Sequence, residues 1–159
     1  MNQPQALEPV TERPTPTSRL KPEQLCDDPT LLCEVRVFLE NYQMAVRMLR
    51  LCREDGRQRQ SHADDCGVDP IYYGKVGGDA DEWLRQMQDI RAFIEALPNR
   101  PVKMLLYYHY VRNLTVERTA EEMDISRRGA FRLKKKALAF AAAQLVKWRK
   151  QAQNEQNEK

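Results

Sequence analysis

The chain has 159 residues, of which 42% are hydrophobic and 31% charged, and only 6 are glycine. The scarcity of glycine and the absence of regularly spaced Val/Ile/Thr runs argue against an all-β protein, so we expect an all-α fold. No apolar run approaches the roughly 18 residues of a membrane-spanning helix, and we expect no membrane segment. The N-terminus lacks the apolar stretch of a secretory signal, which predicts a cytoplasmic protein.

The net charge of +3 is distributed unevenly along the chain. Residues 1–99 hold 12 Lys/Arg and 17 Asp/Glu, a net charge of −5, whereas residues 100–159 hold 14 and 6, a net charge of +8. Residues 126–150 contain 9 basic side chains and no acidic one. A basic segment of this kind indicates a polyanionic partner for the C-terminal part.

Both ends of the chain are polar. Residues 1–27 contain five prolines and few apolar residues, and we expect a disordered leader there. Residues 151–159 (QAQNEQNEK) have no apolar periodicity and are predicted to be a disordered tail.

Between these ends, the first half of the chain predicts two amphipathic helices. Apolar residues follow a 4-3 spacing over about residues 29–57, and the same spacing returns in a second helix that ends at Leu97. Residues 58–79 contain four glycines and a proline, which predicts a loop. We therefore expect an antiparallel helical hairpin over residues 28–98. Each apolar stripe is wider than one partner helix can cover, so the C-terminal part or a second copy in a homo-oligomer must bury the rest.

The cysteines do not predict a metal site. No CxxC pair is present, and Cys33 and Cys52 fit the first helix as small core residues. Cys52, His62 and Cys66 do not have the spacing of a zinc finger or ribbon and lack a fourth ligand. No nucleotide-binding or metalloprotease motif occurs either, so we expect no cofactor, no catalytic residue and no enzyme.

Three helices in quick succession are predicted over residues 99–150. The first covers about Arg100–Arg112, Thr115 caps a short second helix, and Ser126 caps a third helix that ends near Lys150. Ala120, Ile125, Ala130 and Leu133 have the spacing of the buried positions in a helix-turn-helix motif, and Asp124 tolerates the left-handed conformation of its turn.

If Ala130 and Leu133 point inward, the basic side chains at the start of the third helix point outward. In a helix-turn-helix motif this end of the second helix enters the major groove, where arginine suits guanine edges and lysine suits phosphates. Phe131 fits either a packing position or contact with a thymine methyl group. The predicted DNA-binding residues on this helix are Arg127, Arg128, Phe131, Arg132, Lys134, Lys135 and Lys136.

The stretch LPNRPVKMLLYYHYVRNLTVERTAEEMDISRRGAFRLKKKAL resembles region 4 of the sigma-70 family. The whole chain is similar in architecture to small phage and prophage regulators of the ArpU and RinA type. The resemblance implies that Thr115 and Ser126 also face DNA. It further implies regulation of late genes in a bacterial host cell and contact with RNA polymerase. No segment resembles sigma region 2, so an independent sigma factor is not expected.

Two other functions fit the same pattern. Small terminase subunits of DNA-packaging machines, like other architectural DNA-binding proteins, also join a helix-turn-helix to helical oligomerisation elements, although these subunits usually carry it at the N-terminus. Alternatively, the basic helix of a protein-interaction module binds an acidic partner. Salt-dependent binding to duplex DNA separates the first alternative from the second.

Overall fold

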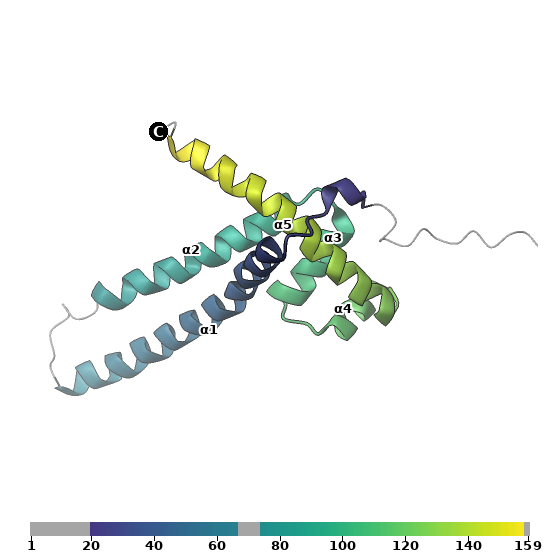
Figure 1. Ribbon diagram of the computed structural model, residues 1–159. Helices are drawn as coiled ribbons and strands as arrows, with labels where there is room; N and C mark the ends of the chain where they lie inside the picture. Colours follow the sequence, from purple (N-terminus) through teal and green to yellow (C-terminus); the bar gives the residue numbers. More distant parts are fainter. Residues whose placement is uncertain (1–19, 67–73, 158–159) are drawn as a thin grey trace, which may run out of the picture.

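The computed structural model describes residues 20–66 and 74–157 (Figure 1). Every element in these ranges is helical, which confirms the all-α prediction for the described residues. The elements in chain order are η2 (Pro22–Gln24), α1 (Pro29–Cys66), α2 (Gly74–Ala96), α3 (Arg100–Leu106), η4 (Tyr107–Val111), α4 (Val116–Glu122) and α5 (Arg127–Asn157). No helix in the described ranges combines the length and the apolarity that a membrane crossing requires.

The helices α1 and α2 run side by side in opposite chain directions (Figure 1). The rings of Phe38 and Phe93 meet edge to face across them, with centroids 5.5 Å apart. The helices α1 and α2 both extend into the predicted loop of residues 58–79. The polar stretch 58–66 contains neither glycine nor proline to end α1, whereas α2 begins at Gly74 and includes Gly77 and Gly78. Residues 67–73 lie outside the described ranges.

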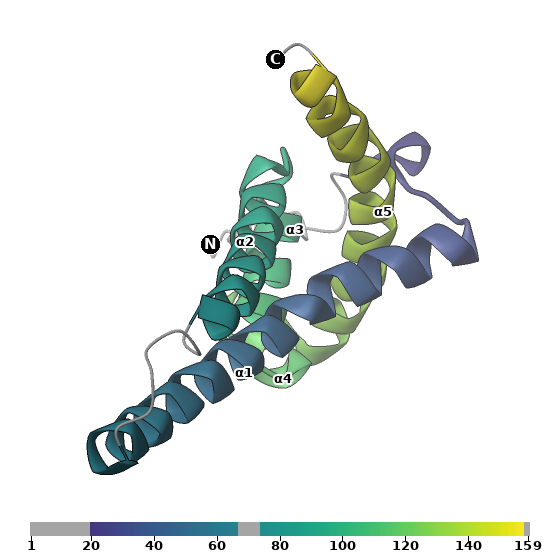
Figure 2. The same cartoon turned by 90° about the vertical axis from the view of Figure 1, so that its left-hand side faces the viewer.

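The helix α5 packs against α1, α3 and α4, and it crosses α1 in Figure 2. Its buried Phe140 belongs to the same apolar cluster as Leu39 of α1, Phe93 of α2 and Leu106 of α3. The predicted boundary at residue 98 therefore separates elements that share one core. The C-terminal part covers much of the apolar surplus predicted for the first two helices. Cys33 is an exception to the predicted core, because it is exposed on α1.

The predicted helix 100–112 changes its winding halfway along its length. After α3, the π-helical turn η4 closes with a hydrogen bond of 3.0 Å from the Arg112 amide to the Tyr107 carbonyl. The Gln43 amide on α1 donates to the carbonyls of Tyr110 and Val111, at 2.8 and 3.0 Å. A side chain of α1 thus satisfies backbone acceptors that the end of a helix leaves free.

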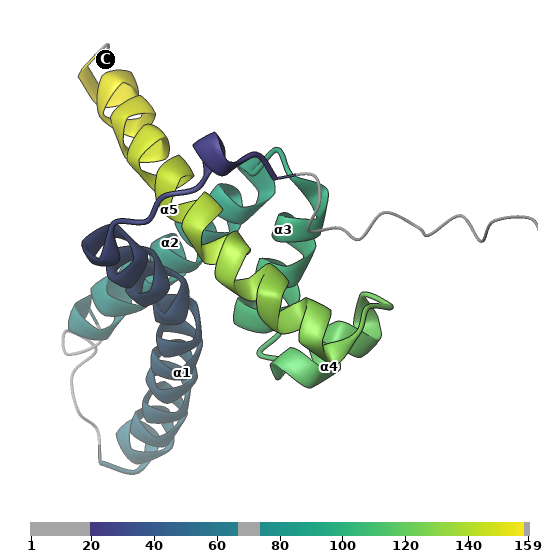
Figure 3. The same cartoon turned by 45° about the vertical axis from the view of Figure 1, so that its right-hand side comes forward.

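The chain before α1 packs onto α5, which corrects the predicted leader for residues 20–27 (Figure 3). Leu20 is 8% exposed, and the Cys26 amide donates to the Ala139 carbonyl at 3.0 Å. Apolar side chains at the end of the proline-rich stretch allow this packing. Residues 1–19 lie outside the described ranges.

The other end of the chain is also more ordered than predicted. The helix α5 continues to Asn157, so residues 151–157 are helical rather than disordered. Alanine, glutamine and glutamate in this segment have good helix propensity, and no breaker follows Lys150.

Candidate nucleic-acid interface

The helices α4 and α5 meet at a small apolar centre. Val116 and Ala120 of α4 pack with Ala130 of α5, and Ile125 from the intervening turn lies against both this group and the main core. The Ile125 amide donates to the Ala120 carbonyl at 3.0 Å, which closes the turn. The predicted inward positions are therefore buried or half-buried.

One buried polar residue of α4 was not predicted. Thr119 is only 1% exposed, and its hydroxyl donates to the Thr115 carbonyl at 2.9 Å. Its place one turn after Val116, beside Ala120, puts it on the inward face of α4. The spacing of Thr119 from the inward Val116 is the sequence feature that indicates its burial.

The two predicted capping residues cap their helices. The Thr115 hydroxyl accepts from the Arg118 amide at 3.3 Å, and the Ser126 hydroxyl accepts from the Gly129 amide at 3.0 Å. Asp124 has a φ of 53°, as its place in the turn predicted. Thr115 and Ser126 are both exposed.

The exposed start of α5 presents most of the predicted basic residues. Arg128, Arg132 and Lys135 are exposed, and no ion pair in the described part of the chain involves them. Arg128 and Arg132 are four residues apart and therefore share one helical face. Lys136 follows on the same helix and is half-buried.

Arg127 differs from these residues because it has two partners. Its guanidinium lies 3.0 Å from a carboxylate oxygen of Glu117 on α4. The same group lies over the ring of Phe131, 5.9 Å from the ring centroid. Glu117 of α4 therefore lies in one cluster with Arg127 and Phe131 from the first two turns of α5.

Lys134 does not share the outward face. It is half-buried and lies near Arg36 and Glu40 of α1. Burial lowers the pKa of Lys134, the positive charge of Arg36 lowers it further, and Glu40 opposes both effects. Lys134 therefore lies closer to α1 than the exposed Arg128 and Arg132 do, and its phosphate contact stays a prediction.

A polar cluster that was not predicted joins η4 to α1 and α5. The His109 Nδ1 donates to the Leu114 carbonyl at 2.7 Å. Burial lowers the pKa of His109 below 6.5, although the Leu114 hydrogen bond raises it, and nearby Lys134 and Glu40 act in opposite directions. Burial also raises the pKa of Tyr110 to about 12, with Glu40 acting in the same direction.

The exposed basic face ends where the N-terminal segment crosses α5. Ala139 lies one turn beyond Lys135 on the same side of the helix and is buried. The amide of Cys26 is bonded to its carbonyl. The buried middle of α5 therefore separates the exposed basic residues of its first three turns from Lys147, Arg149 and Lys150 near its other end.

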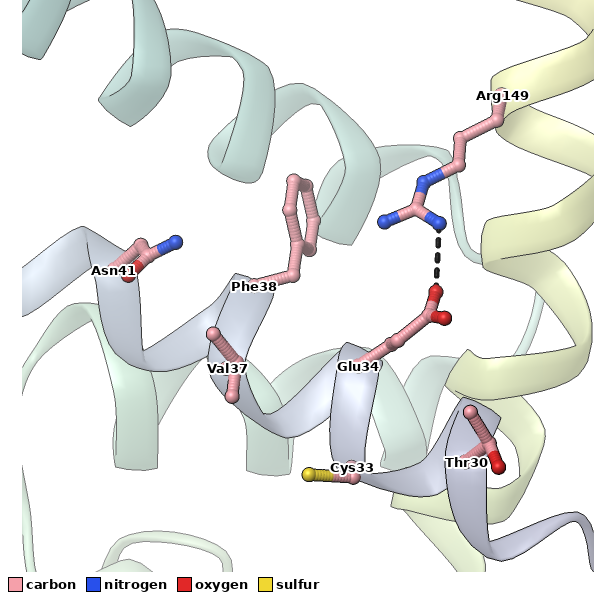
Figure 4. A pocket seen from close by; sticks show the side chains of 7 residues that line it. All are labelled: Thr30, Cys33, Glu34, Val37, Phe38, Asn41 and Arg149. Atoms are coloured by element: carbon pink, nitrogen blue, oxygen red, sulfur yellow. Dashed lines mark hydrogen bonds and ion pairs between the residues drawn. The ribbon is translucent and has the colours of Figure 1, made fainter.

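A separate hollow of about 380 Å³ lies between α1 and the far end of α5 (Figure 4). Arg149 reaches across it to Glu34, with 2.8 Å between nitrogen and oxygen. At 1.5 Å per residue, Arg149 is roughly 32 Å along α5 from Arg128, so the hollow is remote from the basic face. Among the described side chains, no group of three His, Cys, Asp or Glu could hold a metal ion. The side chains of His62 and Cys66 lie outside that description.

Comparison of the chain with protein-family models, curated proteins and solved structures finds no match. The geometry of α4 and α5 and the charges that these helices present are therefore the basis for assigning a function.

Proposed function

We propose that this protein is a sequence-specific DNA-binding transcription regulator and that α4 and α5 form its helix-turn-helix. One observation supports this proposal above all. The exposed Arg128, Arg132 and Lys135 occupy the start of a capped helix that is held against a short helix by an apolar turn residue. This is the arrangement with which helix-turn-helix proteins place side chains in the major groove.

Each side chain has a distinct role in this proposal. Arg128 and Arg132 read base edges, because a guanidinium can donate two hydrogen bonds to guanine. Lys135 binds a phosphate, which positions the protein without specifying a sequence. Lys136 lies beside it and adds positive charge. Thr115 and Ser126 lie at the helix ends closest to the DNA backbone.

The resemblance to sigma-70 region 4 and to ArpU- and RinA-type regulators supports a more specific role. We propose that the protein acts on phage-derived genes in the cytoplasm of a bacterial host, together with host RNA polymerase. DNA packaging, and binding of an acidic protein, are the competing functions.

We also propose that a second copy of the chain associates along α1. Val37, Met44 and Leu51 are 51%, 49% and 51% exposed, and their seven-residue spacing gives a narrow apolar stripe. Glu40 and Arg47 flank this stripe, are exposed and are also seven residues apart. An antiparallel second copy sets each Glu40 beside the Arg47 of its partner, which favours a copy of this chain as the occupant.

Selection of bound sites from random duplex DNA, followed by a salt titration, tests the DNA-binding proposal. About four to six phosphate contacts predict a log–log salt slope of about −4 to −5 for one module, at roughly 0.9 per phosphate. A shared sequence motif among the selected sites supports a regulator. Sequence-independent binding by a chain that assembles into a large ring supports a packaging protein. A slope near zero with tight binding to an acidic protein contradicts DNA binding.

A further inference from the structure

The Glu117–Arg127 pair is the ion pair in the described structure that joins α4 to α5. Arg127 is the first residue of α5, so its side chain lies at the end of the helix that enters DNA in the proposed function. Glu117 holds it from one side at 3.0 Å, and the half-exposed ring of Phe131 lies 5.9 Å from it on the same helix. Arg127 thus has a defined place before any DNA is bound.

Glu117 is ionised at neutral pH. The hydrogen bond at its own backbone amide lowers the pKa of its carboxyl most, and the positive charge of Arg127 lowers it further. Its negative charge offsets the positive charge of Arg127, beside the exposed Arg128 and Arg132 at the start of α5. A carboxylate at this place also repels the phosphates of any duplex, whatever its sequence.

We propose that Glu117 is a positioning residue that determines the sequence specificity of Arg127. It holds Arg127 away from the phosphates and beside Phe131, so that the guanidinium contacts DNA only where a suitable base edge meets it. The repulsion weakens binding to every DNA sequence, but the contact with the correct base edge makes up for this loss. The difference in affinity between the correct site and other sites therefore increases. This inference rests on the proposed DNA-binding function and adds a residue of α4 to the determinants of that function.

The chain offers a matched control on the same short helix. Glu121 pairs with Arg118 at 2.8 Å, and both side chains are well exposed. This pair lies within α4 and does not reach α5. Glu117→Gln and Glu121→Gln therefore remove the same charge from the same helix, and only the first releases Arg127.

The experiment measures the full-length chain on its selected duplex and on random duplex DNA over a range of salt concentrations. We expect Glu117→Gln to bind random DNA more tightly and to steepen its salt slope by about 0.9, the value of one added phosphate contact. We expect the ratio of specific to random affinity to fall about tenfold, with the lost preference at one base pair of the selected motif. Glu121→Gln should change the ratio and the motif little.

A double-mutant cycle tests whether Glu117 acts through Arg127. In an Arg127→Gln background, Glu117→Gln should leave the specificity ratio unchanged, because the direct repulsion between the carboxylate and phosphates acts on all sequences alike. Melting curves establish that all variants are folded. If Glu117→Gln changes the specificity ratio equally with and without Arg127, the inference is overturned. Equal effects of Glu117→Gln and Glu121→Gln also overturn it, while DNA binding by the wild type stands. A wild type without salt-dependent duplex binding overturns the proposed function, and this inference with it.

Discussion

Arg128 and Arg132 are the side chains on which sequence recognition depends in the proposed function. They share an exposed face of α5, and no ion pair in the described ranges holds either of them. Arginine at such a place can form two hydrogen bonds with one guanine, which a phosphate-binding lysine does not.

We expect Arg128→Ala and Arg132→Ala each to weaken binding to the selected site by about 1–3 kcal/mol while changing random-duplex binding much less. Arg149→Ala is the matched control, because it removes the same charge at the far end of α5. Binding isotherms on both duplexes provide the measurement. Equal losses on specific and random DNA would show that the two arginines contact only phosphates.

His109 links the pH of the solution to the stability of the junction between η4 and the segment that precedes α4. Its pKa is lowered in the folded chain, mainly by burial, whereas the unfolded chain has the ordinary value near 6.5. As the pH falls below about 6.5, the unfolded state takes up a proton that the folded state does not, so stability falls.

We therefore expect the melting temperature to fall between about pH 7.5 and about pH 5.5, and to fall less in His109→Asn. Asparagine keeps an amide donor near the position of Nδ1, which contacts the Leu114 carbonyl, but it does not titrate. Thermal melts of both proteins at both pH values measure the difference. An unchanged pH dependence in the variant would exclude His109 as its source.

At the scale of elements, α5 depends on segments that are distant in the sequence. Leu20 and Cys26 cover its middle, while α1 and α3 cover the side with Phe140. The segment before α1 therefore buries apolar surface in the middle of α5, next to the basic residues of its first three turns.

We expect Leu20→Ala to destabilise the protein by about 2 kcal/mol, the lower part of the range for a buried leucine. The neighbouring exposed residue makes Lys21→Ala a suitable control. A chain shortened to residues 28–150 should likewise melt below the full chain, contrary to the expectation from its polar ends alone. Calorimetry or circular-dichroism melts measure both effects, and a Leu20→Ala melt equal to that of Lys21→Ala would contradict the packing role.

At the scale of the whole molecule, one core joins the first two helices to the C-terminal part. Gln43 of α1 holds η4, and Leu39 and Phe140 lie in the same cluster. Because α1 is held on one side by this core, its opposite side, with Val37 and Met44, is left exposed. In the proposed dimer, the position of the proposed DNA-binding surfaces depends on how two copies of α1 meet.

We expect the chain to form dimers in solution and Met44→Glu to dissociate them, because a buried unpaired carboxylate costs several kcal/mol. Arg50→Glu changes an exposed residue of α1 outside the stripe and serves as the control. Light scattering over a range of protein concentrations measures the mass. A dimer should also double the salt slope on a site with two half-sites. A wild type that is monomeric at all concentrations would contradict association along α1.

The all-α class, the capping residues Thr115 and Ser126 and the inward positions Ala130 and Leu133 could all be predicted from the amino-acid sequence. These features follow from local spacing, turn chemistry and helix periodicity, which nearby residues specify. Three features become visible only once the helices are packed: residues 20–27 pack on α5, Lys134 lies near α1, and Glu117 pairs with Arg127. Such contacts join residues that are far apart in the chain or lie on different helices, and local periodicity does not encode how those helices cross.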